Sequence, residues 1–171
     1  MKNIALLWVL GFAIAGCGEA KPSQVAVTEI PKGWDYTQTK DELDGTIANM
    51  ACRYSRVPGE ENLTARLCLY AIPEGRVNFL DMDGRDFDCA DCKVRIRYDD
   101  KVMSVNANKD ARNGSIALLL ADGDALERGL MVTQIRMATK VGVEVPLAGA
   151  PPKVVWFEVS GLDVGKIESA L

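Results

Sequence analysis

The sequence has no histidine, few aromatic residues and only one long apolar run. Of its 171 residues, 6% are aromatic, 48% hydrophobic and 26% charged. Without histidine there is no His-ligated metal site and no Ser-His or Cys-His catalytic pair. A single apolar run excludes a membrane protein with several spans. The remaining composition and length are those of a globular chain with one domain.

The apolar run lies at the N-terminus and has the pattern of an export signal. Lys2 precedes an apolar stretch at residues 4–15 that is interrupted only by Gly11. About a dozen residues is short for a transmembrane helix, which needs ~20. A positive start, an apolar run and small residues before a cleavage point are typical of a secretory signal peptide. We therefore expect a signal peptide helix at residues 1–16.

The residues that follow the apolar run, Ile14-Ala15-Gly16-Cys17, resemble the lipobox of bacterial lipoproteins. This resemblance implies cleavage before Cys17 and a lipid anchor on Cys17, where several acyl chains hold a protein stably at a membrane. Gly18 stands where an aspartate would signal inner-membrane retention, which favours the outer membrane. The alternative is an ordinary signal peptide with a chance cysteine. Residues 17–32 are expected to form a lipidated tether, followed by a single domain at residues 33–171.

The charge balance argues against nucleic acid as a partner. The chain has 20 basic and 24 acidic residues, and removal of Lys2 with the signal leaves 19 basic residues against the same 24. An acidic protein outside the cytoplasm is poorly suited to a phosphate backbone. The expected partners are the membrane, through the anchor, and another envelope protein or a cell-wall polymer. No cofactor is predicted.

Four cysteines remain beside Cys17, and an even number in an oxidising compartment indicates two disulfides. Three connectivities are possible, of which we favour Cys52–Cys68, between neighbouring strands, and Cys89–Cys92, around a small loop. A redox-active pair at Cys89 and Cys92 would need the helix N-terminus that lowers a thiol pKa, and an alternating strand follows instead. A four-cysteine zinc site usually needs two close pairs.

Alternating apolar and polar residues predict strands, and turn residues separate them. The predicted strands lie at residues 63–71, 93–98, 141–147 and 155–159, and the continuous apolar run 116–120 predicts a strand buried on both faces. A helix is expected from residue 124 to about 138, with Leu126, Leu130, Met131, Ile135 and Ala138 on one face, and a short helix at 163–171. The fold class is therefore mainly β: an antiparallel β-sandwich with one or two short helices.

The densest acidic cluster consists of Asp81, Asp83, Asp86 and Asp88. Several carboxylates in one loop suit a hard cation such as calcium. The spacing does not match an EF-hand calcium loop, however, because with Gly84 at the sixth position the first position would be Phe79, which has no oxygen ligand in its side chain. A solvated acidic turn is the expected alternative to a metal site. A cation-dependent hydrolase built on this cluster is a further hypothesis, but we predict that the protein is not an enzyme. Ser160 has no base and is expected at a turn.

The expected contact surface is a basic stripe, formed by Lys93, Arg95 and Arg97 on one face of a strand. Such a stripe could bind an anionic polymer, a lipid phosphate or an acidic partner. The alternative is an exposed sheet face whose cations are balanced by acidic residues on a neighbouring strand.

Four segments resemble the type VI secretion accessory family known as VasI or TagO and related bacterial and phage proteins. They are Trp34-Asp35-Tyr36 with Asp41-Glu42, Leu67-Cys68-Leu69, the strand and turn at residues 92–100, and Phe157-Glu158-Val159-Ser160-Gly161-Leu162. They occur in the family's order over most of the mature chain. The resemblance implies an exported accessory domain and assigns no catalytic residue.

These observations predict an outer-membrane-anchored lipoprotein that acts as a non-catalytic binding or accessory module in the cell envelope. The family resemblance implies that this module is associated with secretion. The alternative is a phage- or plasmid-encoded surface lipoprotein that blocks a receptor or inhibits a lytic enzyme.

Overall fold

The computed structural model describes residues 29–43, 45–72, 75–119 and 125–168. The predicted signal peptide, Cys17 and most of the predicted tether lie outside these residues. The described part is mainly β, as expected, with nine strands and two short helices. The elements are β1 (Asp35–Lys40), β2 (Ile47–Val57), β3 (Glu60–Ile72), β4 (Gly75–Met82), β5 (Cys92–Tyr98), β6 (Lys101–Lys109), β7 (Ile116–Leu119), α1 (Ala125–Met137), β8 (Lys140–Val145), β9 (Lys153–Glu158) and α2 (Gly165–Glu168).

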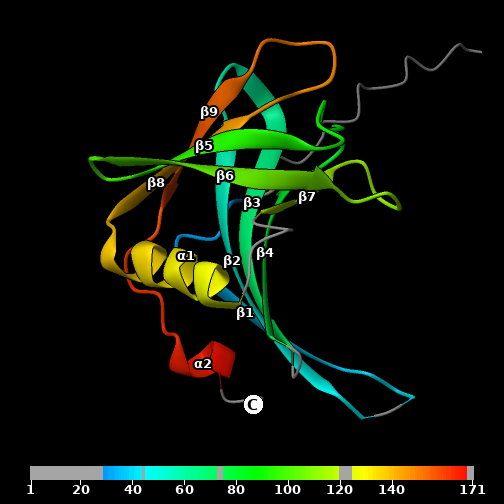
Figure 1. Cartoon of the computed structure of the whole chain (residues 1–171), viewed down its shortest axis with the longest axis vertical. Helices are drawn as coiled ribbons and strands as arrows, with labels where there is room; N and C mark the ends of the chain where they lie inside the picture. The colour runs from blue at the N-terminus through cyan, green and yellow to red at the C-terminus, as the bar shows by residue number, and fades with distance from the viewer. Residues whose placement is uncertain (1–28, 44, 73–74, 120–124, 169–171) are drawn as a thin grey trace, which may run out of the picture.

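The strands form one antiparallel sheet rather than the two sheets of the expected sandwich. Their order is β1-β2-β3-β4-β7-β6-β5-β8-β9, and hydrogen bonds join each neighbouring pair. The long strands β2, β3 and β4 run vertically in Figure 1, and β5, β6 and β8 cross them. The sheet curls so far that β9, at one end, contacts β2 near the other. Its two halves therefore face each other as two sheets would, which explains why the strand pattern suggested a sandwich.

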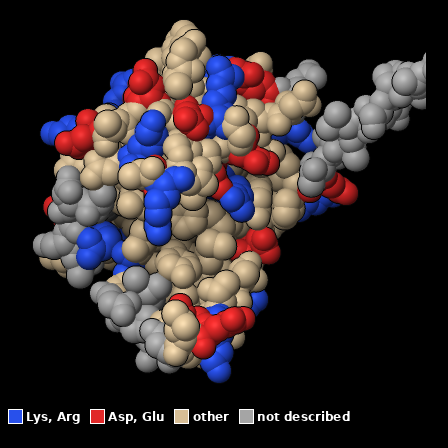
Figure 2. All heavy atoms as spheres, turned by 90° about the vertical axis from the view of Figure 1, so that its right-hand side faces the viewer, with Lys and Arg blue, Asp and Glu red and all other residues tan. Residues whose placement is uncertain are grey.

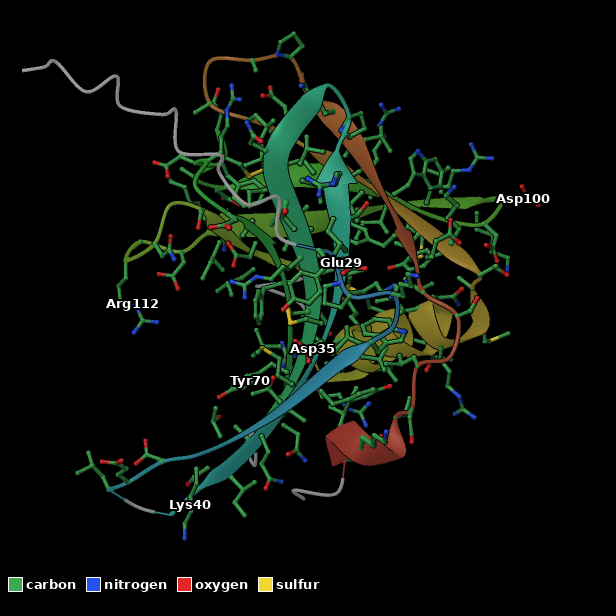
Figure 3. All side chains as sticks on the ribbon, turned by 180° about the vertical axis from the view of Figure 1, so that it is seen from behind. Glu29, Asp35, Lys40, Tyr70, Asp100 and Arg112 are labelled. Carbon is green, nitrogen blue, oxygen red and sulfur yellow. A yellow bond between two sulfur atoms is a disulfide. The ribbon has the colours of Figure 1, made fainter. Side chains whose placement is uncertain are left out.

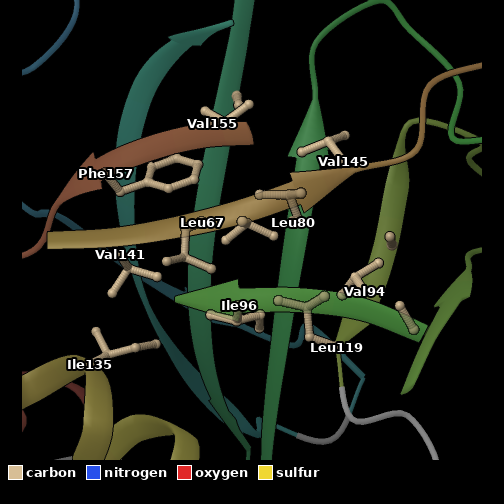
Figure 4. Packing of buried hydrophobic residues seen from close by; sticks show 14 of the residues in the cluster. Leu67, Leu80, Val94, Ile96, Leu119, Ile135, Val141, Val145, Val155 and Phe157 are labelled. Atoms are coloured by element: carbon tan, nitrogen blue, oxygen red, sulfur yellow. The ribbon is translucent and has the colours of Figure 1, made fainter. Parts of the chain in front are cut away.

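The core lies inside this curl. Alternate residues of β3 and β5 point inward, so that Leu67, Ile96 and their neighbours are fully buried. Figure 4 shows Val155 and Phe157 of β9 and Val141 of β8 packed between these strands, with Ile135 of α1 beside them. Fully burying a side chain of this size contributes roughly 1.5–3 kcal/mol to folding, so the inward faces hold the curl together.

The predicted strands agree with the structure at β3, β5, β8 and β9, where one face is buried and the period-two signal is strong. The run at 116–120 corresponds to β7, but only Ala117 and Leu119 are fully buried, so β7 is not covered on both faces. The alternation in the sequence predicted no strand at β2, β4 or β6. In β2 the neighbours Ala51 and Cys52 are both buried, and such burial on both faces removes the alternation.

The main helix was placed correctly, but its apolar face is not fully covered. Met131, Ile135 and Ala138 are buried, whereas Leu126 and Leu130 remain 72% and 50% exposed. The predicted C-terminal helix is the short α2, of which Ile167 packs into the core. Neither described helix is long and apolar enough to cross a membrane.

Side chains close the gap where β9 meets β2. Beyond Cys52, β2 has no partner in β1, because the β1–β2 ladder ends at the pair Asp35–Cys52. Arg53 donates a hydrogen bond to the carbonyl of Glu158, and the Ser55 hydroxyl donates to the Trp156 carbonyl at 2.6 Å. We call this contact the seam. Backbone carbonyls of β9 that would otherwise stay unpaired are satisfied there by side chains of β2.

Candidate binding surfaces

Both disulfides have the expected pairing. Cys52 and Cys68 are directly opposite in β2 and β3, with their Cα atoms 4.2 Å apart. Cys89 and Cys92 close the short loop before β5. All four cysteines are therefore engaged in structural cross-links. Cys17 lies outside the described residues.

The acidic cluster does not assemble into a metal site in the described structure. Asp81 is only 3% exposed, and its carboxylate pairs with Arg66 and accepts a hydrogen bond from Ser115 at 3.1 Å. Asp83, Asp86 and Asp88 are exposed. No group of three or more acidic or cysteine side chains in the described ranges is placed to hold a metal ion. Asp81 therefore acts as the buried partner of a cation, a structural role that its sequence context did not reveal.

The cations of the predicted stripe lie on the outer face of β5, and all three are exposed. Arg95 makes a two-pronged ion pair with Glu144 of β8, at 2.5 and 3.1 Å. This pair lowers the pKa of Glu144 and raises that of Arg95, mainly through its hydrogen bonds. Arg97 lies 3.7 Å from the Asp100 carboxylate. The alternative of a charge-balanced face is therefore correct for Arg95 and, more loosely, for Arg97, and only Lys93 has no ion pair with a described residue.

The same outer face carries an aromatic side chain that the sequence analysis did not select. Arg97, Gly142 and Trp156 occupy one row across β5, β8 and β9. A Cβ atom on Gly142 would lie 2.8 Å from the Trp156 ring, so the indole rests directly over this glycine. The cations of Arg97 and Lys140 lie 5.9 and 5.3 Å from the ring centroid. We call Arg97, Lys140, Gly142 and Trp156 the Trp156 platform.

Two exposed valines extend the platform on the same face. Val102 faces Arg97 across the β5–β6 ladder and is 59% exposed, and Val154 of β9 is 42% exposed. The arrangement combines a half-buried indole, two cations and exposed aliphatic groups. Trp and Arg are the residues most enriched among the energetic centres of protein interfaces. One feature of the sequence could have pointed to the Trp156 platform: Gly142 interrupts a run of valines in its strand.

A groove separates β6 from α1. One part has a volume of about 270 Å³ and is lined by Lys93 of β5, Met103 to Asn106 of β6, and Glu127, Leu130 and Met131 of α1, with Tyr98 at its base. A second part, of about 230 Å³, continues along α1 to the turn between β5 and β6 and is also lined by Tyr98. Burial raises the pKa of the Tyr98 phenol well above its ordinary value. Like an ordinary tyrosine, whose pKa is about 10, it is protonated at neutral pH and can donate a hydrogen bond.

Charge is mixed on the face of the molecule that Figure 2 shows. On the face shown in Figure 2, lysine and arginine side chains alternate with aspartate and glutamate, and neither sign dominates a large area. Figure 3 shows Asp100, at the tip of the β5–β6 hairpin, and Arg112 on opposite sides of the molecule. A simple electrostatic footprint for an anionic polymer is therefore not evident on the face of Figure 2.

Comparisons of the chain with family models, with curated proteins and with solved structures found no match. The resemblance to the VasI or TagO family therefore stays a prediction.

Proposed function

We propose that this chain is a lipid-anchored, non-catalytic binding module of the cell envelope, which docks on another envelope protein through the Trp156 platform. The observation that carries the proposal is the Trp156 indole lying over Gly142 between two cations. A half-buried Trp with neighbouring Arg and exposed aliphatic side chains suits a protein partner better than a purely anionic polymer.

Two further features support the cellular setting of this proposal. The lipobox-like segment ending in Cys17 favours an anchored lipoprotein on the outer membrane. Two disulfides in one small domain are typical of proteins that work in an oxidising compartment. The part of the chain at residues 17–32 would act as the tether between the anchor and the binding domain.

The test of the platform is a pull-down of the full lipidated protein from its own envelope, followed by mass spectrometry. Truncation of a central interface Trp costs about 2 kcal/mol or more, which is roughly 30-fold in affinity. We expect Trp156→Ala and the double variant Arg97→Glu/Lys140→Glu each to lose a partner that the wild type retains. The matched control, Lys40→Glu/Arg112→Glu, makes the same charge change at the far end of the β1–β2 ladder and in the loop before β7, and should retain the partner.

The outcome separates the parts of the proposal. Retention of every captured protein by both platform variants, with unchanged thermal unfolding, would remove the platform from the function. The identity of a lost partner would show whether the module belongs to a secretion system, as the family resemblance implies. Metabolic labelling with an alkyne fatty acid tests the anchor separately, because Cys17→Ala should abolish the label.

A further inference from the structure

We propose that residues 24–28, which precede the described part of the chain, dock on an apolar patch on the outer face of β2, β3, β4 and β7. This face is the side of the sheet that points away from the core, and these strands are not those of the Trp156 platform. We call the patch the outer apolar patch. It consists of six half-buried side chains, Met50, Tyr54, Tyr70, Val77, Phe79 and Leu118.

The strand registers make the outer apolar patch continuous. Met50, Tyr70 and Val77 occupy one row across β2, β3 and β4. In the next row, Phe79 and Leu118 follow the disulfide that joins β2 to β3. Because alternate residues of a strand point to the same face, these side chains lie on one side of four neighbouring strands.

The centre of this face is packed rather than solvated. Cys52 and Cys68 are 2% and 0% exposed, although neither belongs to the hydrophobic core cluster. An antiparallel sheet with one solvated face normally carries polar side chains on that face. The outer face of β5, with its three exposed cations, follows this rule. The outer apolar patch does not, which indicates that it has an occupant.

The described chain begins beside the patch. At the start of β1, the Asp35 carboxylate accepts a hydrogen bond from the Tyr54 hydroxyl at 3.2 Å. Before β1, the carbonyl of Pro31 accepts a hydrogen bond from the Arg53 side chain at 3.4 Å. The segment that precedes Glu29 therefore starts close to β2, next to the patch (Figure 3).

The segment has the length to cross the patch. Neighbouring strands lie about 4.8 Å apart, so the distance from β2 to β4 is about 10 Å. Five residues in an extended conformation span about 16 Å. Residues 24–28 are therefore sufficient to pass over β3 and reach β4.

The sequence of the segment fits an apolar surface. In an extended conformation, Val25 and Val27 point to one side and Ala26 and Thr28 to the other. Residues 22–28 contain no charged side chain, so docking would bury no charge. A segment that served only as a free spacer would need no alternating valines.

Docking would shorten the reach of the domain from its anchor, a consequence that rests on the proposed lipidation of Cys17. Residues 17–28 could extend to about 40 Å as a free tether. With residues 24–28 docked, residues 17–23 remain and extend to about 25 Å. The binding module would then act close to the membrane surface. The docking itself does not depend on the anchor.

The experiment is photo-crosslinking of the full-length protein in its own envelope. A photoreactive benzoylphenylalanine replaces Tyr70 in one variant and Phe79 in another, and mass spectrometry identifies the residues that are joined after irradiation. We expect crosslinks to residues 24–28 of the same chain. The matched control carries the probe at Val102, which is 59% exposed on the outer face of the other half of the sheet. It should give no crosslink to this segment.

Two charge variants of the segment test which side of it contacts the patch. Val25→Asp/Val27→Asp places carboxylates against apolar side chains, which is costly, so the crosslink yield should fall by about tenfold or more. Ala26→Asp/Thr28→Asp makes the same charge change on the opposite side and should keep most of the yield. Equal yields from the two variants would contradict the proposal.

The crosslinked product also separates the alternative occupants. Crosslinks to a second copy of the chain, to another protein or to lipid, or no crosslink from either position, would each overturn the proposal. Cys17→Ala and Trp156→Ala should both retain the crosslink to residues 24–28. A failure of the proposed anchor or of the Trp156 platform can therefore be distinguished from a failure of this inference.

Discussion

Two strand edges of this sheet are treated differently. At the seam, β2 and β9 approach each other without a backbone ladder, and Arg53 and Ser55 occupy the carbonyls of β9. At the groove, the first half of β6 has no such cover among the described residues, although α1 lies nearby. Among the described residues, the seam is a closed edge and the first half of β6 an open one.

The difference shows that side chains alone can close one edge of a curled sheet. Unpaired strand edges promote aggregation, and proteins usually cover or block them. Lys153 reinforces the upper end of the seam by contacting the Pro58 carbonyl at 3.1 Å and Glu60 at 2.9 Å. The first half of β6 instead lies beside a hollow that residues of α1 help to line. The following predictions would break or sharpen this comparison.

The largest expected effect comes from the disulfide at the start of the seam. Cys52 is the last β2 residue paired with β1, and its bond to Cys68 fixes β2 against β3 where the seam begins. The double variant Cys52→Ala/Cys68→Ala should lose about 3 kcal/mol of unfolding free energy, as expected for a loop of this length. Urea unfolding measures this loss of unfolding free energy. The variant pair Cys89→Ala/Cys92→Ala, with a separation of 3 residues rather than 16, should lose less.

A smaller loss is expected at the groove, from Asp99→Ala. The carboxylate makes charge-assisted hydrogen bonds to two backbone N–H groups, and Asp99 has a positive φ of 46° that alanine tolerates poorly. Together these should cost about 2 kcal/mol. Asp99→Asn tolerates the same backbone and keeps one acceptor oxygen, so it should lose clearly less. Equal losses in the two variants would show that the hydrogen bonds do not hold the turn to α1.

The side chains of the seam should each contribute about 1 kcal/mol, the usual net value of a hydrogen bond in a protein. Arg53→Ala and Ser55→Ala should reduce the free energy of unfolding by that amount and speed hydrogen exchange in β9. Ser104→Ala is the control on the open edge, because the Ser104 hydroxyl has no hydrogen bond to a described residue, and it should change stability little. Similar effects of the two serine variants would remove the contrast between the edges.

The smallest effect concerns pH. Glu60 accepts a hydrogen bond from Lys153 and also pairs with Arg85, and these contacts lower the pKa of Glu60, the bond from Lys153 most strongly. A lowered pKa in the folded state adds stability above the unfolded pKa of about 4.3, and this stability is lost as the pH falls through the folded value. Glu60→Gln should therefore be slightly less stable than the wild type at pH 7 and equal to it near pH 2. A difference that persisted unchanged at pH 2 would exclude the ionic explanation.

Local patterns in the sequence predicted a large part of the fold. Leu67 and Leu69 alternate with polar neighbours in β3, and Val94 and Ile96 do so in β5, so their inward faces were predictable from a period of two. The favoured cysteine pairing was also correct, because Cys52 and Cys68 stand on strands that are neighbours in the chain. β4 was missed because its buried residues include the polar Asn78 and Asp81, whose partners come from α1, β3 and the segment before β7.

The candidate surfaces were only partly predictable. The stripe of Lys93, Arg95 and Arg97 is exposed on one face, as the alternation indicated, but the pairing of Arg95 with Glu144 depends on β5 and β8 becoming neighbours. Trp156 and Gly142 are separated by 14 positions in the chain and become a unit only through the β8–β9 register. The groove depends on α1 lying beside β6, which no local pattern encodes.

The sequence by itself determined the strand faces, the cysteine pairing we favoured and the position of the main helix, because each depends on residues close together in the chain or on a short repeat. The tertiary structure alone decided that the strands form one curled sheet, that side chains close its seam, and that α1 lies beside β6. Those features depend on contacts between distant segments, such as Ser55 with Trp156, whose geometry is fixed only when the whole sheet has formed.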